Sequence, residues 1–362
     1  MLNAKELVTV IENFDIEEIE IQRYGNGHIN DTYVVSQNGV KMLLQRLNTN
    51  IFKNPEGVME NIVNVTEHLK KKIAANGGDP ERETMTVINA SDGKPYFITE
   101  SGKFFRMYKF IDNNLSVDKA QSTEQMTSAA ETLGKFYHML DDFPAETLSV
   151  AIPKFHDTRN YYNRLMGAIE NDVAGRKASV EKEIEFVKNH EFLADILNNG
   201  LADGSILLRV THNDTKLNNI LFDAPTGKGL CVIDLDTVMP GSVLYDFGDA
   251  MRFGAASGPE DEKDLDKIWF DLDMFDAFTK GFAAEMKETL VEGEIKNLVN
   301  SVKILTFECG MRFLEDHLNG DTYFKIHREN HNIDRARTQF KLVADMEAKT
   351  AEMEAIVSKY CK

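Results

Sequence analysis

Two short apolar segments joined by a turn-rich link constrain the second half of this chain more than any other feature. Residues 220–222 (Ile-Leu-Phe) and 230–233 (Leu-Cys-Val-Ile) have strand character, and the link 223–227 contains aspartate, proline and glycine. This pattern predicts two antiparallel strands connected by a turn. Asn219 directly precedes the first strand and Asp234 directly follows the second, so we expect both side chains at the same end of the hairpin.

The residues just before this hairpin suggest a chemistry. The run 211–219 reads Thr-His-Asn-Asp-Thr-Lys-Leu-Asn-Asn and brings together the Asp214 carboxylate, the Lys216 cation and the Asn219 amide. With Asp234, these groups suit phosphoryl transfer from ATP to a hydroxyl, which needs a proton acceptor, positive charge near the phosphoryl group and oxygen ligands for Mg²⁺. Taken singly, the same residues are equally consistent with an asparagine-rich surface turn and a strand-end aspartate.

Length and composition set the class of protein. The chain has 362 residues, more than one hydrophobic core usually serves, so two lobes are expected. Its net charge of −18 argues against nucleic acid or an anionic membrane as a partner. Three cysteines without paired spacing, no apolar stretch of membrane-spanning length and no signal-peptide pattern predict a soluble, cytoplasmic protein. We expect a monomer.

The first 112 residues predict a small antiparallel sheet with one helix. Asn38-Gly39 is a strong hairpin signal because both residues adopt positive φ readily, and Asp92-Gly93 suggests a second hairpin. The resulting order of three strands, a helix and three strands resembles the small lobe of the kinase fold with one strand in excess. The expected strands are 19–24, 32–35, 41–45, 84–88, 96–99 and 104–110, and the expected helix is 55–72.

Helical patterns predominate beyond residue 112. Together with the resemblance of the first half to a kinase small lobe, they imply an α+β, bilobal, protein-kinase-like fold. Its N-lobe (1–112) would bind nucleotide, and its mostly helical C-lobe (113–362) would hold the catalytic loop, the metal site and the acceptor site. The expected helices are 126–140, 184–197, 275–286, 295–318 and one long helix over 335–360.

A glycine-rich segment lies between the first two predicted strands. Gly25 and Gly27 flank Asn26, and residues without a Cβ let the backbone approach phosphate groups closely. A Gly-Asn-Gly segment is more often only a turn. No GxxxxGK[ST] sequence occurs, which disfavours a P-loop nucleotide site.

The loop around Asp214 resembles the HRDxKxxN catalytic loop of protein kinases, with Asp214, Lys216 and Asn219 in register. It resembles still more the HxDxxxxN loop of the aminoglycoside phosphotransferase superfamily, in which Ile233-Asp234 matches the metal-binding aspartate after the hairpin. This resemblance implies that Asp214 is the catalytic base, that Lys216 steadies the transferred phosphoryl group and that Asn219 and Asp234 bind Mg²⁺.

A second candidate for the metal-binding aspartate is misleading. Residues 246–248 spell Asp-Phe-Gly, the metal-binding motif of protein kinases, but Asp246 does not stand at the end of the hairpin. Asp234 does, so it has the better position. We therefore expect Asp246 to cap or brace the catalytic loop.

The sequence differs from the kinase pattern at one position. The third-strand lysine that holds the α- and β-phosphates in kinases falls at Gln45, with Arg46 facing the opposite side of the strand. Gln45 can donate only neutral hydrogen bonds, so Lys216 is expected to supply the positive charge. The alternative is a catalytically silent protein that binds nucleotide as a regulator.

At whole-chain level the sequence resembles the N-acetylhexosamine 1-kinase branch of the superfamily, to which the glutamine at Gln45 belongs. This implies phosphorylation of the anomeric hydroxyl of N-acetylglucosamine or N-acetylgalactosamine, with Asp214 acting on that hydroxyl. ATP would contact Gly25, Gly27, Gln45 and the connector 106–112, which includes Tyr108. The matching stretches are 27–30, 45–49, 155–158, 211–220, 233–242, 246–254, 309–314 and 320–324.

The branch resemblance places four further residues at the sugar: His28, Phe253, Arg312 and Tyr323. Simpler roles exist for each, since Arg312 can pair with Glu308 one helical turn away, and Phe253 can be a core residue. A kinase for a cationic acceptor such as choline or an aminoglycoside is the other alternative, because the acidic composition is compatible with it.

Overall fold

The computed structural model describes residues 4–16, 20–25 and 29–361, and the chain divides into two compact units. The first unit comprises Met1–Leu115, Asp142–Pro153 and Ile220–Pro240. The second comprises Ser116–Asp141, Lys154–Asn219 and Gly241–Lys362. An antiparallel sheet characterises the first unit and helices characterise the second, so the predicted α+β class is confirmed.

The first unit contains most of the strands. Its strands are β1 (Glu20–Arg23), β2 (Asp31–Gln37), β3 (Val40–Leu47), β4 (Val87–Ile88), β5 (Phe97–Ile98), β6 (Phe104–Lys109), β7 (Asn114–Leu115), β9 (Ile220–Asp223) and β10 (Gly229–Val232). Its helices are α1 (Ala4–Glu12), α2 (Pro55–Ala75) and α3 (Pro80–Glu83), with 3₁₀ turns η1 (Ala145–Thr147) and η5 (Leu235–Thr237). Strand β11 (Met239–Gly241) crosses the boundary, because the unit ends at Pro240.

The main sheet has the order β1-β2-β3-β6, and the hairpin predicted at Asn38-Gly39 is confirmed. Gln37 lies opposite Val40, and Asn38 and Gly39 both have positive φ, 51° and 80°. This backbone conformation matches the right-handed twist of the flanking strands, which is why the Asn-Gly pair specifies the turn.

The second predicted hairpin, at Asp92-Gly93, is wrong in its pairing. A turn does form, because the Ala90 amide donates to the Lys94 carbonyl at 2.8 Å. However, β4 and β5 each pair with β6 and not with one another, Val87 lying opposite Tyr108 and Phe97 opposite Phe105. Since β3 occupies one edge of the six-residue β6, the two short strands share its other edge in succession.

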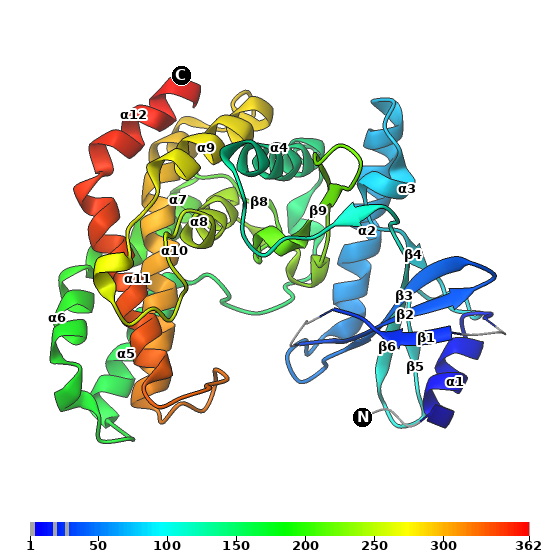
Figure 1. Ribbon diagram of the computed structural model, residues 1–362, viewed down its shortest axis with the longest axis horizontal. Helices are drawn as coiled ribbons and strands as arrows, with labels where there is room; N and C mark the ends of the chain where they lie inside the picture. The colour runs from blue at the N-terminus through cyan, green and yellow to red at the C-terminus, as the bar shows by residue number, and fades with distance from the viewer. Residues whose placement is uncertain (1–3, 17–19, 26–28, 362) are drawn as a thin grey trace. The chain divides into compact units, whose positions relative to one another are not determined.

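The two faces of this sheet have different surroundings. On one face lies α1, which the sequence did not lead us to expect (Figure 1). Its Val10 and Ile11, with Phe14 just beyond it, pack against strand residues such as Leu44 and Met107. Side chains alternate along a strand, so Gln45 and Arg106 project from the opposite face.

The hairpin predicted in the second half of the sequence is confirmed. Strands β9 and β10 are antiparallel, with Ile220 opposite Val232, and β7 adds a third strand. Leu221 and Cys231 form a small core with Ile111.

Helices make up most of the second unit. They are α4 (Thr123–Met139), α5 (Thr158–Asn171), α6 (Glu181–Asn189), α7 (Ile196–Asp203), α8 (Val243–Gly254), α9 (Leu272–Met286), α10 (Glu292–Leu318), α11 (His331–Ala348) and α12 (Thr350–Cys361). The remaining elements are β8 (Arg209–Thr211) and the 3₁₀ turns η2 (Lys177–Ser179), η3 (Glu191–Asp195), η4 (Leu217–Asn219) and η6 (Leu265–Lys267).

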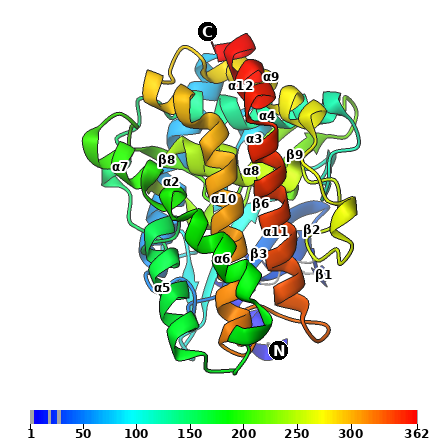
Figure 2. The ribbon, with the colours of Figure 1, turned by 90° about the vertical axis from the view of Figure 1, so that its left-hand side faces the viewer.

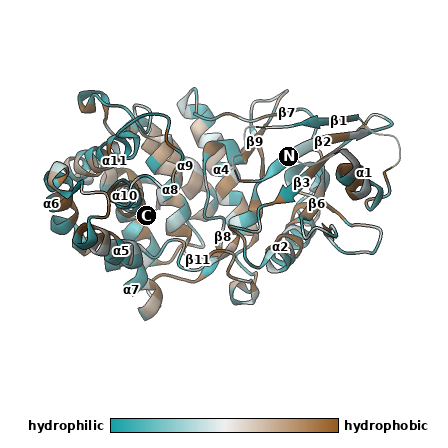
Figure 3. Ribbon diagram, turned by 90° about the horizontal axis from the view of Figure 1, so that it is seen from below, coloured by the Kyte–Doolittle hydropathy of each residue, from teal (hydrophilic) through white to brown (hydrophobic). Residues whose placement is uncertain are grey.

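The 27-residue helix α10 organises this unit. It packs against α5, α8 and α11, and Figure 2 shows α10 and α11 side by side. Helix α4 packs against α9, where a Cβ on Gly281 would lie 2.3 Å from the Thr127 carbonyl oxygen, so only glycine permits this approach. Hydrophilic and hydrophobic residues both occur along α4 and α2, as amphipathic helices require (Figure 3).

The long helix predicted over 335–360 is divided in two. Lys349 separates α11 from α12, and its ammonium group bonds to the Phe270 carbonyl at 2.8 Å and to Asp345 at 2.7 Å. The segment predicted as one helix over 184–197 likewise consists of α6, η3 and the start of α7. Among the described residues, no helix has the length and apolarity of a membrane span.

A buried amide stabilises the first unit. Asn61, on α2, is 1% exposed, donates to the carbonyls of Ser149 and Val238 at 2.7 and 2.8 Å, and accepts from the Ser149 amide at 2.8 Å. One side chain therefore joins α2 to two segments that are distant in sequence.

We expect Asn61→Leu to lower the free energy of unfolding by about 2–4 kcal/mol, because it leaves buried backbone groups without partners. Urea unfolding followed by circular dichroism would measure this. The matched control is Asn64→Leu on the exposed side of α2, which should change stability little. Equal losses in the two variants would contradict this role of Asn61.

Candidate active site

The loop 211–219 has an unusual conformation that a buried carboxylate supports. Asp246, at 0% exposure near the start of α8, accepts the backbone N–H groups of His212 at 2.8 Å and Asn213 at 2.6 Å. It also accepts the hydroxyl of Tyr137 at 2.7 Å. Asn213 has a positive φ of 65°, a strained conformation for a residue with a Cβ. Asp246 thus braces the loop, as predicted.

This brace brings three of the predicted site residues together. The Lys216 ammonium lies 2.7 Å from Oδ1 of Asp214, and the Asn219 side-chain amide donates to the Asp214 carbonyl at 2.8 Å. Partial burial lowers the pKa of Lys216, but the Asp214 charge and hydrogen bond outweigh this and raise it above its ordinary value. Lys216 therefore remains a cation beside a carboxylate whose side chain is 26% exposed.

Asn219 is the predicted metal ligand on this loop. Its Nδ2 faces Asp214, an assignment made from the hydrogen-bond pattern, so Oδ1 is the end directed away. An amide oxygen and a carboxylate suit Mg²⁺, which takes most of its remaining ligands from water and phosphate. Asp234, the second predicted ligand, belongs to the first unit. Within each described unit, no three His, Cys, Asp or Glu side chains form a metal-binding group.

A buried histidine supports the same loop from another direction. His156 contacts Oε1 of Glu308 through Nδ1 at 3.0 Å and the Asn213 carbonyl oxygen through Nε2 at 3.3 Å. Both partners are acceptors, so both ring nitrogens carry protons and the ring is an imidazolium. Burial lowers the pKa of His156, but the Glu308 carboxylate outweighs it and raises that pKa above its ordinary value.

The first unit contains the second group of predicted site residues. Gln45 does not point a free amide toward a ligand: its Nε2 donates to the Thr32 hydroxyl at 3.1 Å. Its Oε1 accepts two hydrogen bonds from Arg106, at 2.8 and 3.1 Å. Arg106 is 1% exposed, and the sequence analysis did not identify it as a functional residue.

Arg106 connects Gln45 with the segment that carries Asp234. Its Nη1 lies 2.5 Å from Oδ1 of Asp236, and Oδ2 of Asp236 accepts from Asn30 at 2.7 Å. Oδ2 of Asp236 is therefore hydrogen-bonded, whereas Oδ1 is in an ion pair with Arg106 but accepts no hydrogen bond of good geometry from the described residues. Asp234, with a φ of 61°, stands where η5 begins, two residues before Asp236.

The remaining nucleotide-site predictions have mixed outcomes. Tyr108 lies in β6 and not in the connector that follows; it is 2% exposed, and its hydroxyl has no hydrogen-bond partner among the described residues. Gly25 has a positive φ of 71° and open space where a Cβ would lie, so a ligand could approach its backbone. Gly27 and His28 lie outside the described residues.

Arg312 lines a cavity of about 220 Å³ in the second unit. It does not pair with Glu308, which bonds to His156 and Thr158. Its guanidinium lies over the rings of Tyr161 and Phe324, at 5.2 and 5.7 Å. Among the described residues Arg312 has no carboxylate partner, so its donors are available to a ligand.

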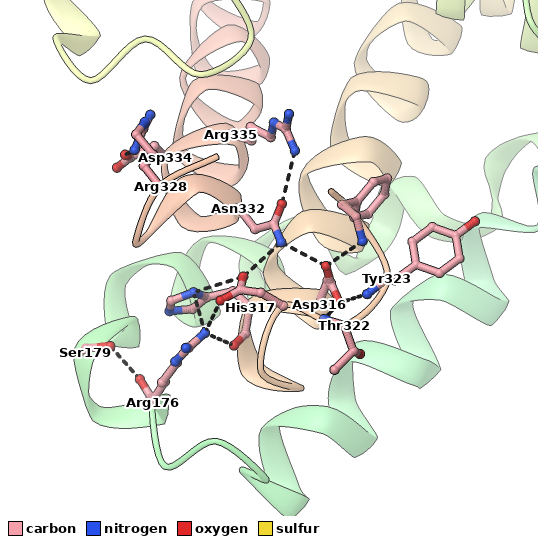
Figure 4. A network of polar contacts seen from close by, with 12 residues as sticks. Arg176, Ser179, Asp316, His317, Thr322, Tyr323, Arg328, Asn332, Asp334 and Arg335 are labelled. Carbon is pink, nitrogen blue, oxygen red and sulfur yellow. Dashed lines mark hydrogen bonds and ion pairs between the residues drawn. The ribbon is translucent and has the colours of Figure 1, made fainter. Parts of the chain in front are cut away.

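Tyr323 lies on the loop beside this cavity, and Asp316 determines the shape of that loop. Asp316 accepts the backbone amides of Thr322, Tyr323 and Phe324 at 2.8–2.9 Å and the side-chain amide of Asn332 at 2.8 Å. Figure 4 shows this network, with the Tyr323 ring pointing away from Asp316. The ring is 74% exposed.

Phe253 lines a different cavity, of about 380 Å³, with Arg252, Glu260 and Gln339. The side-chain oxygen Oε1 of Gln339 is buried and has no hydrogen-bond partner among the described residues. The structure therefore groups Arg312 with Tyr323 but places Phe253 beside other residues. Asp316 and Arg106 have no motif of their own in the sequence, because each acts through contacts with distant segments. His156 lies in the matching stretch 155–158, but that stretch did not indicate its contact with the loop.

Comparison with known proteins identifies the fold and the family. A model of the phosphotransferase enzyme family (APH) matches residues 20–278. A microcompartment-associated aminopropanol kinase is 14% identical with a TM-score of 0.62, covering 97% of this chain and 99% of that one. An aminoglycoside phosphotransferase from Alicyclobacillus acidocaldarius is 13% identical with a TM-score of 0.64, covering 99% and 97%.

A third solved structure holds ligands. A spectinomycin phosphotransferase in complex with ADP and spectinomycin is 14% identical with a TM-score of 0.52, covering 94% of this chain and 99% of that one. At these identities the likeness concerns the fold, and it confirms the kinase-like architecture predicted from the sequence.

The protonated His156 predicts a pH-dependent stability. The pKa of His156 is higher in the folded than in the unfolded protein. Its contribution to the free energy of unfolding is therefore complete below the unfolded-state pKa near 6.5, and it is lost as the pH rises through the folded-state pKa. The difference in Tm between wild type and His156→Gln should therefore be largest near pH 6 and shrink toward pH 9. Thermal unfolding across this range measures it, with the exposed His138→Gln as control. A difference that grows with pH would contradict the assignment.

Proposed function

Because the chain belongs to the phosphotransferase enzyme family, we propose that it is an ATP- and Mg²⁺-dependent kinase that phosphorylates the anomeric hydroxyl of N-acetylhexosamines. The observation that carries the phosphotransfer chemistry is the contact of Asp214 with Lys216 and Asn219 on a loop braced by Asp246. Family membership supports a small-molecule phosphotransferase in general, whereas the choice of a sugar rests on the resemblance to the N-acetylhexosamine 1-kinase branch and on the residues around Arg312.

In this proposal Asp214 orients the acceptor hydroxyl and takes its proton as the bond to phosphorus forms. The anomeric hydroxyl is more acidic than an ordinary alcohol, so a carboxylate of modest basicity suffices. Lys216 places positive charge beside the transferring phosphoryl group, where negative charge is spread over the oxygens. When bound on Asn219 and Asp234, Mg²⁺ would neutralise charge on the phosphates of ATP.

The cavity around Arg312 favours a neutral acceptor. Its two carboxylates are already engaged, since Glu315 pairs with Arg164 at 2.9 Å and Asp316 accepts four hydrogen bonds within its loop. A cationic amino alcohol would need a carboxylate without a partner. The unpaired Arg312 guanidinium instead suits the hydroxyl oxygens of a sugar, and the Tyr161 and Phe324 rings beside it suit apolar C–H groups.

Removal of the base should abolish turnover without unfolding the protein. We expect Asp214→Asn to lower kcat by about 100-fold or more, because a general base contributes about 10²–10⁴-fold to such reactions. Coupled ADP release measures the rate, and circular dichroism and Tm report folding. The control is Asp266→Asn, at an exposed position. An unchanged kcat in Asp214→Asn would remove Asp214 from the mechanism.

An acceptor panel tests the substrate class. Purified protein with Mg-ATP should convert N-acetylglucosamine or N-acetylgalactosamine to the 1-phosphate, with phosphorus NMR locating the new ester. Choline, ethanolamine and aminopropanol should not turn over, and their phosphorylation in place of sugars would overturn the sugar proposal. Turnover with no acceptor, despite nucleotide binding, would instead support a regulator.

Substitution of Arg312 should change KM for the acceptor and not KM for the nucleotide. We expect Arg312→Met to raise KM for the sugar about 10-fold or more, as loss of a charged hydrogen bond implies, with KM for ATP unchanged. The control Arg159→Met removes an arginine that pairs with Glu191 and Asp195 on the surface. An equal rise in both KM values would argue against a specific contact.

A further inference from the structure

The buried cation of the first unit lies on a different strand from the one where the kinase resemblance places it. That resemblance puts a lysine on β3, at the position of Gln45, whereas the structure has Arg106 on β6 directly opposite, as its register partner. Burial alone would lower the pKa of Arg106, but the carboxylates of Asp236 and Asp234 hold it above its usual value. The guanidinium therefore remains charged inside the unit.

Arg106 is too deeply buried to contact phosphate itself. It is 1% exposed, and its donors are directed to Gln45 and to Asp236, with Met59 at 3.9 Å from Nη1. A buried charge without a partner is strongly destabilising, so these contacts specify its position. Any influence of Arg106 on a ligand must be exerted through its partners.

Its partner Asp236 joins four segments of the first unit. Through Asn30, which also accepts the Asn48 amide at 3.0 Å, Asp236 is tied to the residues that follow the glycine-rich segment and to the end of β3. Through Arg106 it is tied to β6 and β3. Asp236 itself lies in η5, two residues after Asp234.

Asp234 needs such an anchor. Its φ of 61° is in the left-handed region, which is unfavourable for an aspartate by about 1 kcal/mol or more and persists only where neighbouring contacts impose it. The following turn is closed by the Val238 amide, which donates to the Leu235 carbonyl at 3.2 Å, and Asp236 attaches that turn to Arg106. The Arg106–Asp236 ion pair thus holds the turn that begins at Asp234.

We propose that Arg106 is a positioning residue for the metal-nucleotide site: acting through Asp236, it orients the Asp234 carboxylate toward Mg²⁺, and Gln45 orients Arg106. This inference rests on the proposed function. It also explains the glutamine on β3, because a lysine there would place a second cation against the Arg106 guanidinium. Gln45 is then an acceptor for Arg106 and not itself a ligand of phosphate.

The proposal predicts an effect on the magnesium-dependent part of nucleotide binding. Calorimetric titration of the full chain with ADP, in Mg²⁺ and separately in EDTA, gives the factor by which Mg²⁺ tightens ADP binding. Arg106→Gln and Gln45→Lys should each reduce this factor about 10-fold or more, while ADP affinity in EDTA stays within about 2-fold of wild type. The control is Arg46→Gln, on the opposite face of β3 and paired with Asp31, which should leave the factor unchanged.

Exchange of the two groups distinguishes positioning from mere loss of a contact. The double variant Gln45→Lys/Arg106→Gln again places one cation and one amide at this register pair, and it should recover most of the Mg²⁺ factor that either single variant loses. If the Mg²⁺ factor of the double variant is reduced as much as the two single reductions multiplied together, the proposal is overturned.

A second variant addresses stability. Arg106→Met/Asp236→Leu replaces the buried ion pair by apolar groups of similar size, a change that folded proteins often tolerate. If it folds, as judged by Tm, it should lose the Mg²⁺ factor; a folded variant that keeps the factor would overturn the proposal. If it does not fold, the exchange variant decides. Failure of the wild type to bind ADP even with Mg²⁺ would instead refute the proposed function.

Discussion

The catalytic loop depends on one buried carboxylate. Asp246 receives the amides of His212 and Asn213 and the hydroxyl of Tyr137, and these bonds hold Asn213 in a left-handed conformation immediately before Asp214. Burial raises the pKa of Asp246 above the usual carboxylate value, although its donors favour the charged form. The strained backbone of Asn213 and the buried carboxylate of Asp246 are each unfavourable alone. The hydrogen bonds between them offset both costs.

A comparable arrangement supports the segment 234–238 of the first unit, where we propose that Asp234 binds Mg²⁺. There the buried pair is Arg106 and Asp236, and the left-handed residue is Asp234. In both places, a buried charged side chain contacts a segment that contains a residue with positive φ. Such preorganisation suits phosphoryl transfer, in which positioning and electrostatics supply most of the catalysis.

Local signals predicted the local structure well. Asn38-Gly39 specified its hairpin because both residues favour positive φ, and the apolar segments on either side of residues 223–227 formed the expected antiparallel pair. Asp92-Gly93 formed a turn, but its flanking strands found a longer partner in β6, and such competition between partners is not visible in a local pattern. A continuous helical pattern is divided at Lys349, whose ammonium group contacts Phe270 and Asp345.

The sequence by itself determined that Asp214, Lys216 and Asn219 belong to one short loop, because they are close along the chain. The expected role of Asp246 followed from the same spacing. Only the tertiary structure decided how the buried charges are paired. Gln45 accepts hydrogen bonds from Arg106, and Asp236 forms an ion pair with Arg106. Glu308 pairs with His156 and not with Arg312, which lines the cavity. The physical reason is that a buried charge takes its partner from whichever segment folding places beside it, and those partners lie tens to hundreds of residues away.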